Sequence, residues 1–160
     1  MASADARTSS ASLTAPAVRS PTAYLFGGES GNLSTIRIYL LTKDGFHLKD
    51  VQDMLSSSAL YSTQKVLSRI IGKSVRTIQR QGSSNKPAQL NSQQSAVAFQ
   101  YAKVLEHAIA VFGTQRGAEE WLGNPCKYLE GGVPLDLIDN PVGFQAVEDY
   151  LERIELGVYQ

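Results

Sequence analysis

The chain of 160 residues is poor in the groups that mark secreted or membrane-bound proteins. Its single cysteine, Cys126, cannot form a disulfide within the chain, and a lone thiol suits a reducing compartment. No apolar run approaches the ~20 residues that a helix needs to cross a bilayer. The first residues also lack the apolar segment of a signal peptide. We therefore expect a cytoplasmic protein without a membrane anchor.

Groups for metal binding and catalysis are equally scarce. His47, His107 and Cys126 do not have the spacing of metal ligands. Glu119 and Glu120 are adjacent, so on a helix they point apart, which is poor geometry for paired acid–base catalysis. The sequence predicts no metal, no cofactor and no enzymatic activity.

The net charge of zero conceals a segregation along the chain. Residues 61–116 contain eight Lys or Arg and one acid, a net charge of +7, whereas residues 117–160 contain two basic residues and nine acids, a net charge of −7. Such sorting favours two partners of opposite sign. The alternative is a single globule with a dipole and no partner.

The first 33 residues are rich in Ala, Ser, Thr, Pro and Gly, a composition that buries too little surface to offset the entropy of ordering. We expect a disordered extension. Its one apolar cluster, 23–26, is interpreted as a strand or a docking peptide, and the leader faintly resembles an organelle transit peptide. A plain tail is the favoured interpretation.

Apolar residues beyond this extension recur at helical spacing, which predicts an all-α fold. The run 36–41 is compatible with strand or helix. Trp121, followed by a turn, is expected in the core. The expected helices are 48–55, Tyr61–Ile71 begun by Ser62 or Thr63, 75–80, Ser92–Phe112, 118–122, 134–138 and 141–155.

A helix that ends at Gly72, a three-residue turn and a helix that begins at Ser74 have the spacing of a helix-turn-helix. In such a unit the second helix enters the major groove, where Arg and Gln side chains read base edges. The candidate DNA-binding residues are Lys65, Arg69, Lys73, Ser74, Arg76, Thr77, Gln79 and Arg80, with Lys86 as a further phosphate contact. The alternative is an ordinary helical pair solvated by basic residues, and Lys73 occupies a turn position where an apolar anchor is common.

The C-terminal helix places Phe144, Val147, Leu151 and Ile154 on one face. Gly157 is a natural helix terminator, and the residues after it have no later segment to pack on. A tyrosine joins an apolar ring to a polar end and suits an interface anchor. The alternative is a frayed end folded back on its own domain.

The C-terminal third carries a dense, ordered set of residues that resembles the Xre–MbcA–ParS antitoxins, the partners of RES-domain toxins. The resemblance covers about residues 45–160 and is strongest beyond residue 104. It rests on Val111, Phe112, Gly113, Ala118, Trp121, Leu122, Pro125, Leu129, Gly132, Pro134, Asp136, Leu137, Gly143, Val147, Leu151, Arg153, Ile154, Glu155, Gly157, Val158 and Tyr159.

The family pattern does not cover the extension (1–33), whose role stays open. For the rest of the chain we expect an Xre-like helix-turn-helix domain for DNA binding and dimerisation (34–90) and a helical toxin-binding domain with an extended tail (91–160). RES toxins act on NAD, and the resemblance implies that the C-terminal end of the antitoxin blocks the NAD pocket. From charge, we expect the tail carboxylate to replace a cofactor phosphate. The expected toxin-binding residues are Glu152, Glu155, Gly157, Val158, Tyr159 and Gln160.

The expected partners are a RES-domain toxin, operator DNA and a second copy of the chain, assembled as a hetero-oligomer with the toxin. The antitoxin is expected to repress its own operon. Two other classes stay open: a stand-alone helix-turn-helix transcriptional regulator without a toxin, and a structural helical adaptor.

Overall fold

The structure, a computed structural model, describes residues 18–29, 32–72, 75–82 and 85–157. Over these ranges the chain is helical and contains no named strand, which confirms the all-α prediction. In chain order the elements are α1 (Pro21–Leu25), α2 (Thr35–Asp44), α3 (Leu48–Ser56), α4 (Ala59–Thr63), α5 (Val66–Ile71), α6 (Val75–Gln81), α7 (Ser92–Phe112), α8 (Gln115–Leu122), the 3-10 helix η1 (Lys127–Leu129), α9 (Pro134–Leu137) and α10 (Pro141–Glu155).

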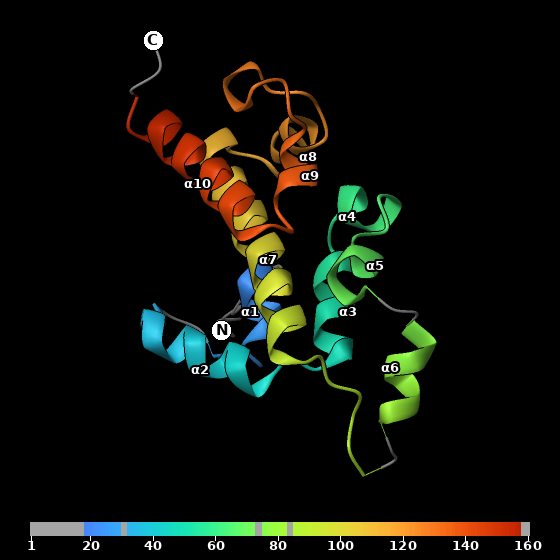
Figure 1. The fold of residues 1–160 in the computed structure, drawn as a ribbon. Coiled ribbons are helices and arrows are strands. Elements are labelled where there is room, and N and C mark those ends of the chain that lie inside the picture. The colour runs from blue at the N-terminus through green and yellow to red at the C-terminus, as the bar shows by residue number, and fades with distance from the viewer. Residues whose placement is uncertain (1–17, 30–31, 73–74, 83–84, 158–160) are drawn as a thin grey trace, which may run out of the picture.

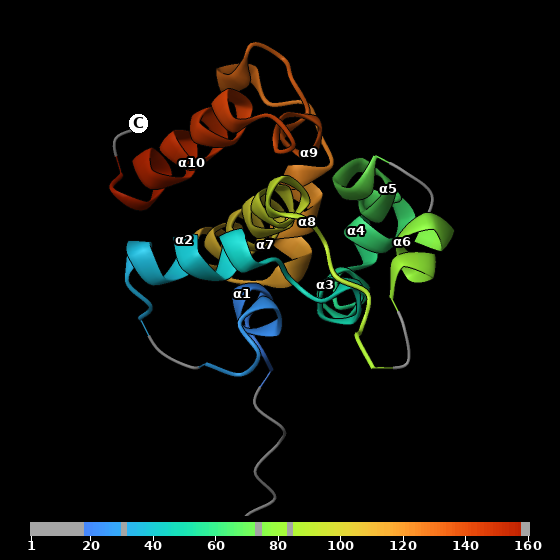
Figure 2. The same cartoon turned by 60° about the horizontal axis from the view of Figure 1, so that its bottom comes forward.

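The long helix α7 runs through the middle of the molecule, and α1, α2, α5, α8 and α10 pack against it (Figures 1 and 2). Asn91 and Gln94 form a capping box at its start, in which each side chain accepts from the other residue's backbone N–H, at 2.8 and 3.0 Å. Gly113 ends the helix at φ 82°, a left-handed conformation that favours glycine. The predicted bounds of this helix are confirmed.

Helix α1 corrects the prediction of disorder for the part of the extension that the structure describes. It packs against α3 and α7 and buries Leu25 and the adjoining Phe26. The backbone N–H and hydroxyl of Thr22 both donate to the Glu106 carboxylate, at 3.0 and 2.6 Å. The apolar cluster 23–26 is therefore helical and docks on its own fold, while residues 1–17 lie outside the described ranges.

The run 36–41 is helical, because it lies within α2. Ser34 begins that helix, and its hydroxyl accepts from the Arg37 N–H at 3.3 Å. Helix α3 follows the predicted pattern and buries the four expected side chains, Leu48, Val51, Met54 and Leu55.

The segment predicted as one helix from Tyr61 to Ile71 is two helices, α4 and α5. Ser58 begins α4, and its hydroxyl accepts from the Tyr61 N–H at 3.2 Å. The prediction of Ser62 or Thr63 as the helix start is therefore wrong. The Thr63 hydroxyl lies at the other end of α4 and donates to the Ala59 carbonyl at 2.9 Å.

A left-handed residue separates the two helices. Lys65 has φ 53° and immediately precedes α5, and the four residues 62–65 are polar and offer no apolar face to continue a helix. Gly72 ends α5 at φ 62°, as predicted.

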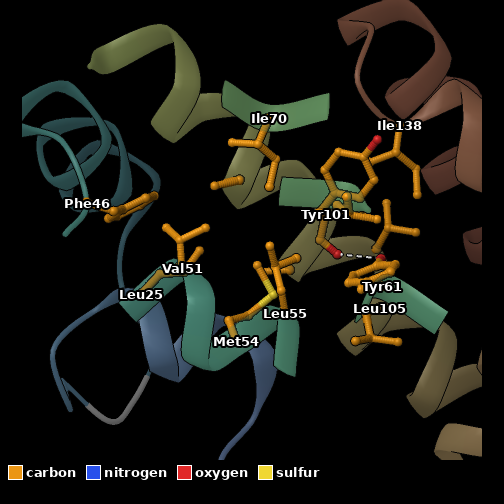
Figure 3. Packing of buried hydrophobic residues seen from close by; sticks show 14 of the residues in the cluster. Leu25, Phe46, Val51, Met54, Leu55, Tyr61, Ile70, Tyr101, Leu105 and Ile138 are labelled. Carbon is orange, nitrogen blue, oxygen red and sulfur yellow. Dashed lines mark hydrogen bonds between the residues drawn. The ribbon is translucent and has the colours of Figure 1, made fainter. Parts of the chain in front are cut away.

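The core crosses from the α3–α5 region to the C-terminal helices (Figure 3). The Tyr61 and Tyr101 rings meet edge to face at 5.5 Å, and the Tyr61 hydroxyl donates to the Tyr101 carbonyl at 2.8 Å. The Tyr101 ring extends toward Ile138, just after α9 (Figure 3). Burial raises the pKa of Tyr61 well above its ordinary value; burial, with the Asp139 charge, raises the pKa of Tyr101 to about 12.

Polar contacts also join the regions on either side of residue 91. The Ser58 hydroxyl donates to the Glu119 carboxylate at 2.7 Å, and the Arg69 guanidinium pairs with Asp136 at 2.7 Å. Helix α7 packs against helices of both regions, so these contacts do not by themselves mark two separate domains. The domain boundary at residue 91 stays a prediction. Across the described ranges, no helix combines the length and the hydropathy that a membrane crossing requires.

Candidate functional site

Helix α10 is fixed at its start by a cap and a close approach. The Asn140 side-chain oxygen accepts from the N–H groups of Val142 and Gly143, at 2.9 and 3.3 Å. A side chain at position 143 would collide with the Leu137 carbonyl oxygen, so the chain needs glycine there. This junction sets the direction in which α10 leaves α9 (Figure 1).

The inward face of α10 is the one that the sequence predicted. Val147 and Leu151 are fully buried, and Phe144 and Ile154 are partly buried. Lys103 of α7 places its ammonium 5.8 Å from the centre of the Phe144 ring. The helix is therefore held on α7 by apolar packing along one side.

Acidic side chains line a hollow of about 360 Å³ where α10 meets α7. His107 of α7 lies between two carboxylates: Nδ1 is 3.0 Å from Glu148 Oε2, and Nε2 is 3.2 Å from Glu155 Oε2. The Lys103 ammonium is 3.9 Å from the same Glu148 oxygen. We name this hollow the acidic groove; its principal residues are Lys103, His107, Phe144, Glu148, Asp149, Glu152 and Glu155.

The expected toxin-binding residues divide between the groove and the chain end. Glu152 and Glu155 are exposed and line the acidic groove. Gly157 is exposed, with φ 68°, just after the end of α10. Val158, Tyr159 and Gln160 lie outside the described residues.

An aromatic stack fastens the outer part of this region. Trp121 stacks on Tyr150 at 5.6 Å and lies 5.4 Å from Phe112. Tyr150 in turn stacks on Tyr128, also at 5.6 Å. Trp121 is only partly buried, so the expectation of a core position holds for its packing and not for full burial.

The candidate DNA-binding residues gather mainly on α6. Ile78 is buried and anchors this helix, and the partly buried Val75 also packs against the core, as predicted. The exposed residues include the four predicted base contacts Arg76, Thr77, Gln79 and Arg80. Figure 1 shows α6 at the edge of the molecule, away from α8, α9 and α10.

The remaining candidates do not share one surface. Lys65 is exposed at the start of α5. Arg69 pairs with Asp136 of α9, whose hydrogen bond raises the pKa of the guanidinium. Lys73 and Ser74, with the predicted helix start at Ser74, lie outside the described residues. A phosphate contact by Arg69 therefore requires exchange of its ion pair.

Sequence reasoning missed Glu148 and His107. Glu148 falls three residues before Leu151 on α10, but its hydrogen-bond partner His107 lies 41 positions earlier, and no local periodicity connects the two. Among the residues that the structure describes, no three His, Cys, Asp or Glu side chains are placed to hold a metal ion.

These features describe a helical protein whose C-terminal module, from mid-α7 to α10, presents an acidic groove that extends to the last residue of α10. Comparison with family models matches residues 107–157 to the family described as Antitoxin Xre/MbcA/ParS C-terminal toxin-binding domain. The match confirms the predicted resemblance over these residues and supports the role of an antitoxin with a toxin as its partner. Comparison with curated proteins gives no match.

Proposed function

We propose that the chain is the antitoxin of a type II toxin–antitoxin pair and neutralises a RES-domain toxin that consumes NAD or transfers ADP-ribose. Residues 157–160 enter the NAD pocket of the toxin and block it. The observation that carries this proposal is the match of residues 107–157 to an antitoxin toxin-binding domain, because α10 ends within it and leads directly to those residues.

The charge distribution supports this mode of binding. A pocket for NAD accommodates two phosphates and therefore needs cationic or N–H donor groups. The segment 117–160 has a net charge of −7, and Glu152 and Glu155 are exposed on α10 close to the chain end. Opposite charge steers association and fixes the orientation of the partners.

Removal of residues 157–160 separates binding from blocking. The shortened chain should bind the toxin through the groove and the helical module, yet leave NAD consumption running. A chain shortened by residues 1–17 is the control and should silence the toxin fully. Affinity is measured by calorimetry and activity by loss of NAD. Full silencing by the chain that lacks residues 157–160 would remove the tail from the mechanism.

The basic region supports a second activity of the same protein, namely binding to its own operator as a homodimer that also assembles with the toxin. Exposed Arg76, Gln79 and Arg80 on α6 carry the chemistry for base and phosphate contacts. Arg80→Ala should weaken operator binding and flatten its salt dependence by about one unit of slope, whereas Lys127→Ala in the acidic segment should not.

The alternative is a helix-turn-helix regulator without a toxin partner, which the exposed basic side chains of α6 also favour. Co-purification distinguishes the two functions. An antitoxin retains a RES-domain protein encoded in the same operon through purification. A stand-alone regulator shifts operator DNA but retains no such partner.

A further inference from the structure

Glu148 is a buried carboxylate with an unused oxygen. The residue is 9% exposed, and its Oε2 faces His107 and Lys103. Its Oε1 is buried and has no hydrogen-bond partner among the residues that the structure describes. A buried carboxylate oxygen without a donor is costly, and Glu148 lies on the wall of the acidic groove. Glu148 therefore keeps one buried acceptor position that no described residue fills, directly beside the groove.

The charges around the groove identify the kind of donor that fits. Four carboxylates line it, from Glu148, Asp149, Glu152 and Glu155. The cationic side chains are Lys103 and His107, so the carboxylates outnumber them even when the imidazole is protonated. Negative charge is thus in excess, and an added cation is favoured.

The shape and chemistry of the groove favour an organic cation over a metal ion. No metal-ligating cluster of three or more side chains exists within the described ranges. The Phe144 ring forms part of the wall and already lies 5.8 Å from one ammonium group. A planar guanidinium can stack on such a ring and still donate to carboxylates in its own plane.

We propose that the acidic groove is the receptor for an arginine side chain of the toxin, whose guanidinium donates to Glu148 and Glu152 and packs on Phe144. This inference rests on the proposed antitoxin function and adds a second attachment point to the tail. Arginine is chosen over lysine because its rigid fork can serve two carboxylates at once, whereas an ammonium is a single point charge.

Two variants of the antitoxin test Glu148 against the full-length toxin. Glu148→Gln keeps the size of the side chain and removes its charge, and it should weaken toxin binding by roughly tenfold to a hundredfold. Glu120→Gln removes an exposed charge from α8 of the same module, and its binding should change by less than about threefold. Equal affinities for the wild-type chain and Glu148→Gln would overturn the inference.

A third variant distinguishes recognition from helix packing. His107→Leu removes the donor that faces Glu148 but keeps the carboxylate. It should strengthen toxin binding, because the carboxylate loses a competing donor. If Glu148 served only to hold α10 on α7, His107→Leu would weaken binding as much as Glu148→Gln does, and the inference would fail. Circular dichroism melting checks that both variants are folded.

Substitutions in the toxin complete the test. One toxin arginine, changed to alanine, should weaken binding to the wild-type antitoxin by tenfold or more and cause no further loss with Glu148→Gln. Additive losses for every toxin arginine would overturn the arginine site. Failure of the wild-type chain to bind the toxin at all would instead defeat the antitoxin function, and the arginine site with it.

Discussion

Leu151→Ala tests how α10 is held, because Leu151 is fully buried on the face of this helix that packs inward. Truncation of a buried leucine costs about 2–5 kcal/mol, through lost apolar contact and the cavity that remains. For a protein of this length, each kcal/mol lowers the melting temperature by about 2–4 °C. A loss of about 3 kcal/mol therefore predicts a decrease of roughly 6–12 °C.

The matched control is Val142→Ala, at a position on the same helix that is 78% exposed. It should change the unfolding free energy by less than about 0.5 kcal/mol. Thermal melts followed by circular dichroism measure both variants. Since Glu148 and Glu152 lie on α10, Leu151→Ala should also weaken toxin binding when the measurement approaches the lowered melting temperature. Equal melting temperatures for the two variants would refute the view that this face of α10 holds the module together.

Two further predictions concern the polar groups of the core and its edge. Asp136→Asn breaks the ion pair with Arg69 and should strengthen operator binding by roughly two- to tenfold, because the guanidinium becomes free for a phosphate. Asp139→Asn removes the same charge from a residue that forms no ion pair with the described part of the chain, and it should act less. Equal effects in a DNA titration would contradict the role of the pair. Burial and the Asp139 charge raise the pKa of Tyr101 to about 12, so the neutral phenol stabilises the folded state fully below about pH 10, and this contribution is lost as the pH rises through about 12. In alkaline unfolding, Tyr101→Phe should raise the pH midpoint while Tyr39→Phe, at a position 54% exposed, leaves it in place; an unchanged midpoint for Tyr101→Phe would contradict this.

The elements that the sequence predicted well are long, periodic and marked by caps at both ends. Helix α7 combines an apolar stripe with Asn91 at its start and Gly113 at its end, so its bounds could be read residue by residue. Helix α10 has the same qualities, with Asn140 before it and an apolar face at helical spacing. Local signals suffice for such elements because each of them points to the same structure.

The elements that the sequence missed depend on a distant contact in one case and on an unusual backbone conformation in the other. Helix α1 has five residues in a segment of disorder-like composition, and its burial comes from α3 and α7. The break between α4 and α5 occurs at Lys65, whose backbone is left-handed. A lysine in the sequence does not predict this conformation. Tertiary packing decided the first case, and single-residue propensities revealed neither.

The candidate sites likewise divide into features that the sequence predicts and features that depend on the fold. The basic side chains of α6 could be predicted, since helical spacing places them opposite Ile78. The pairing of Arg69 with Asp136 and that of His107 with Glu148 could not, because the partners lie 67 and 41 positions apart. The acidic groove is a product of the fold, whereas the segregation of charge along the chain is visible in the sequence alone.

The most direct test of the antitoxin function is titration of the purified RES-domain toxin with this chain while NAD consumption is followed. Activity should fall linearly and reach zero when the number of antitoxin chains equals the number of toxin active sites. NAD consumption that continues undiminished in the presence of excess folded chain would contradict it.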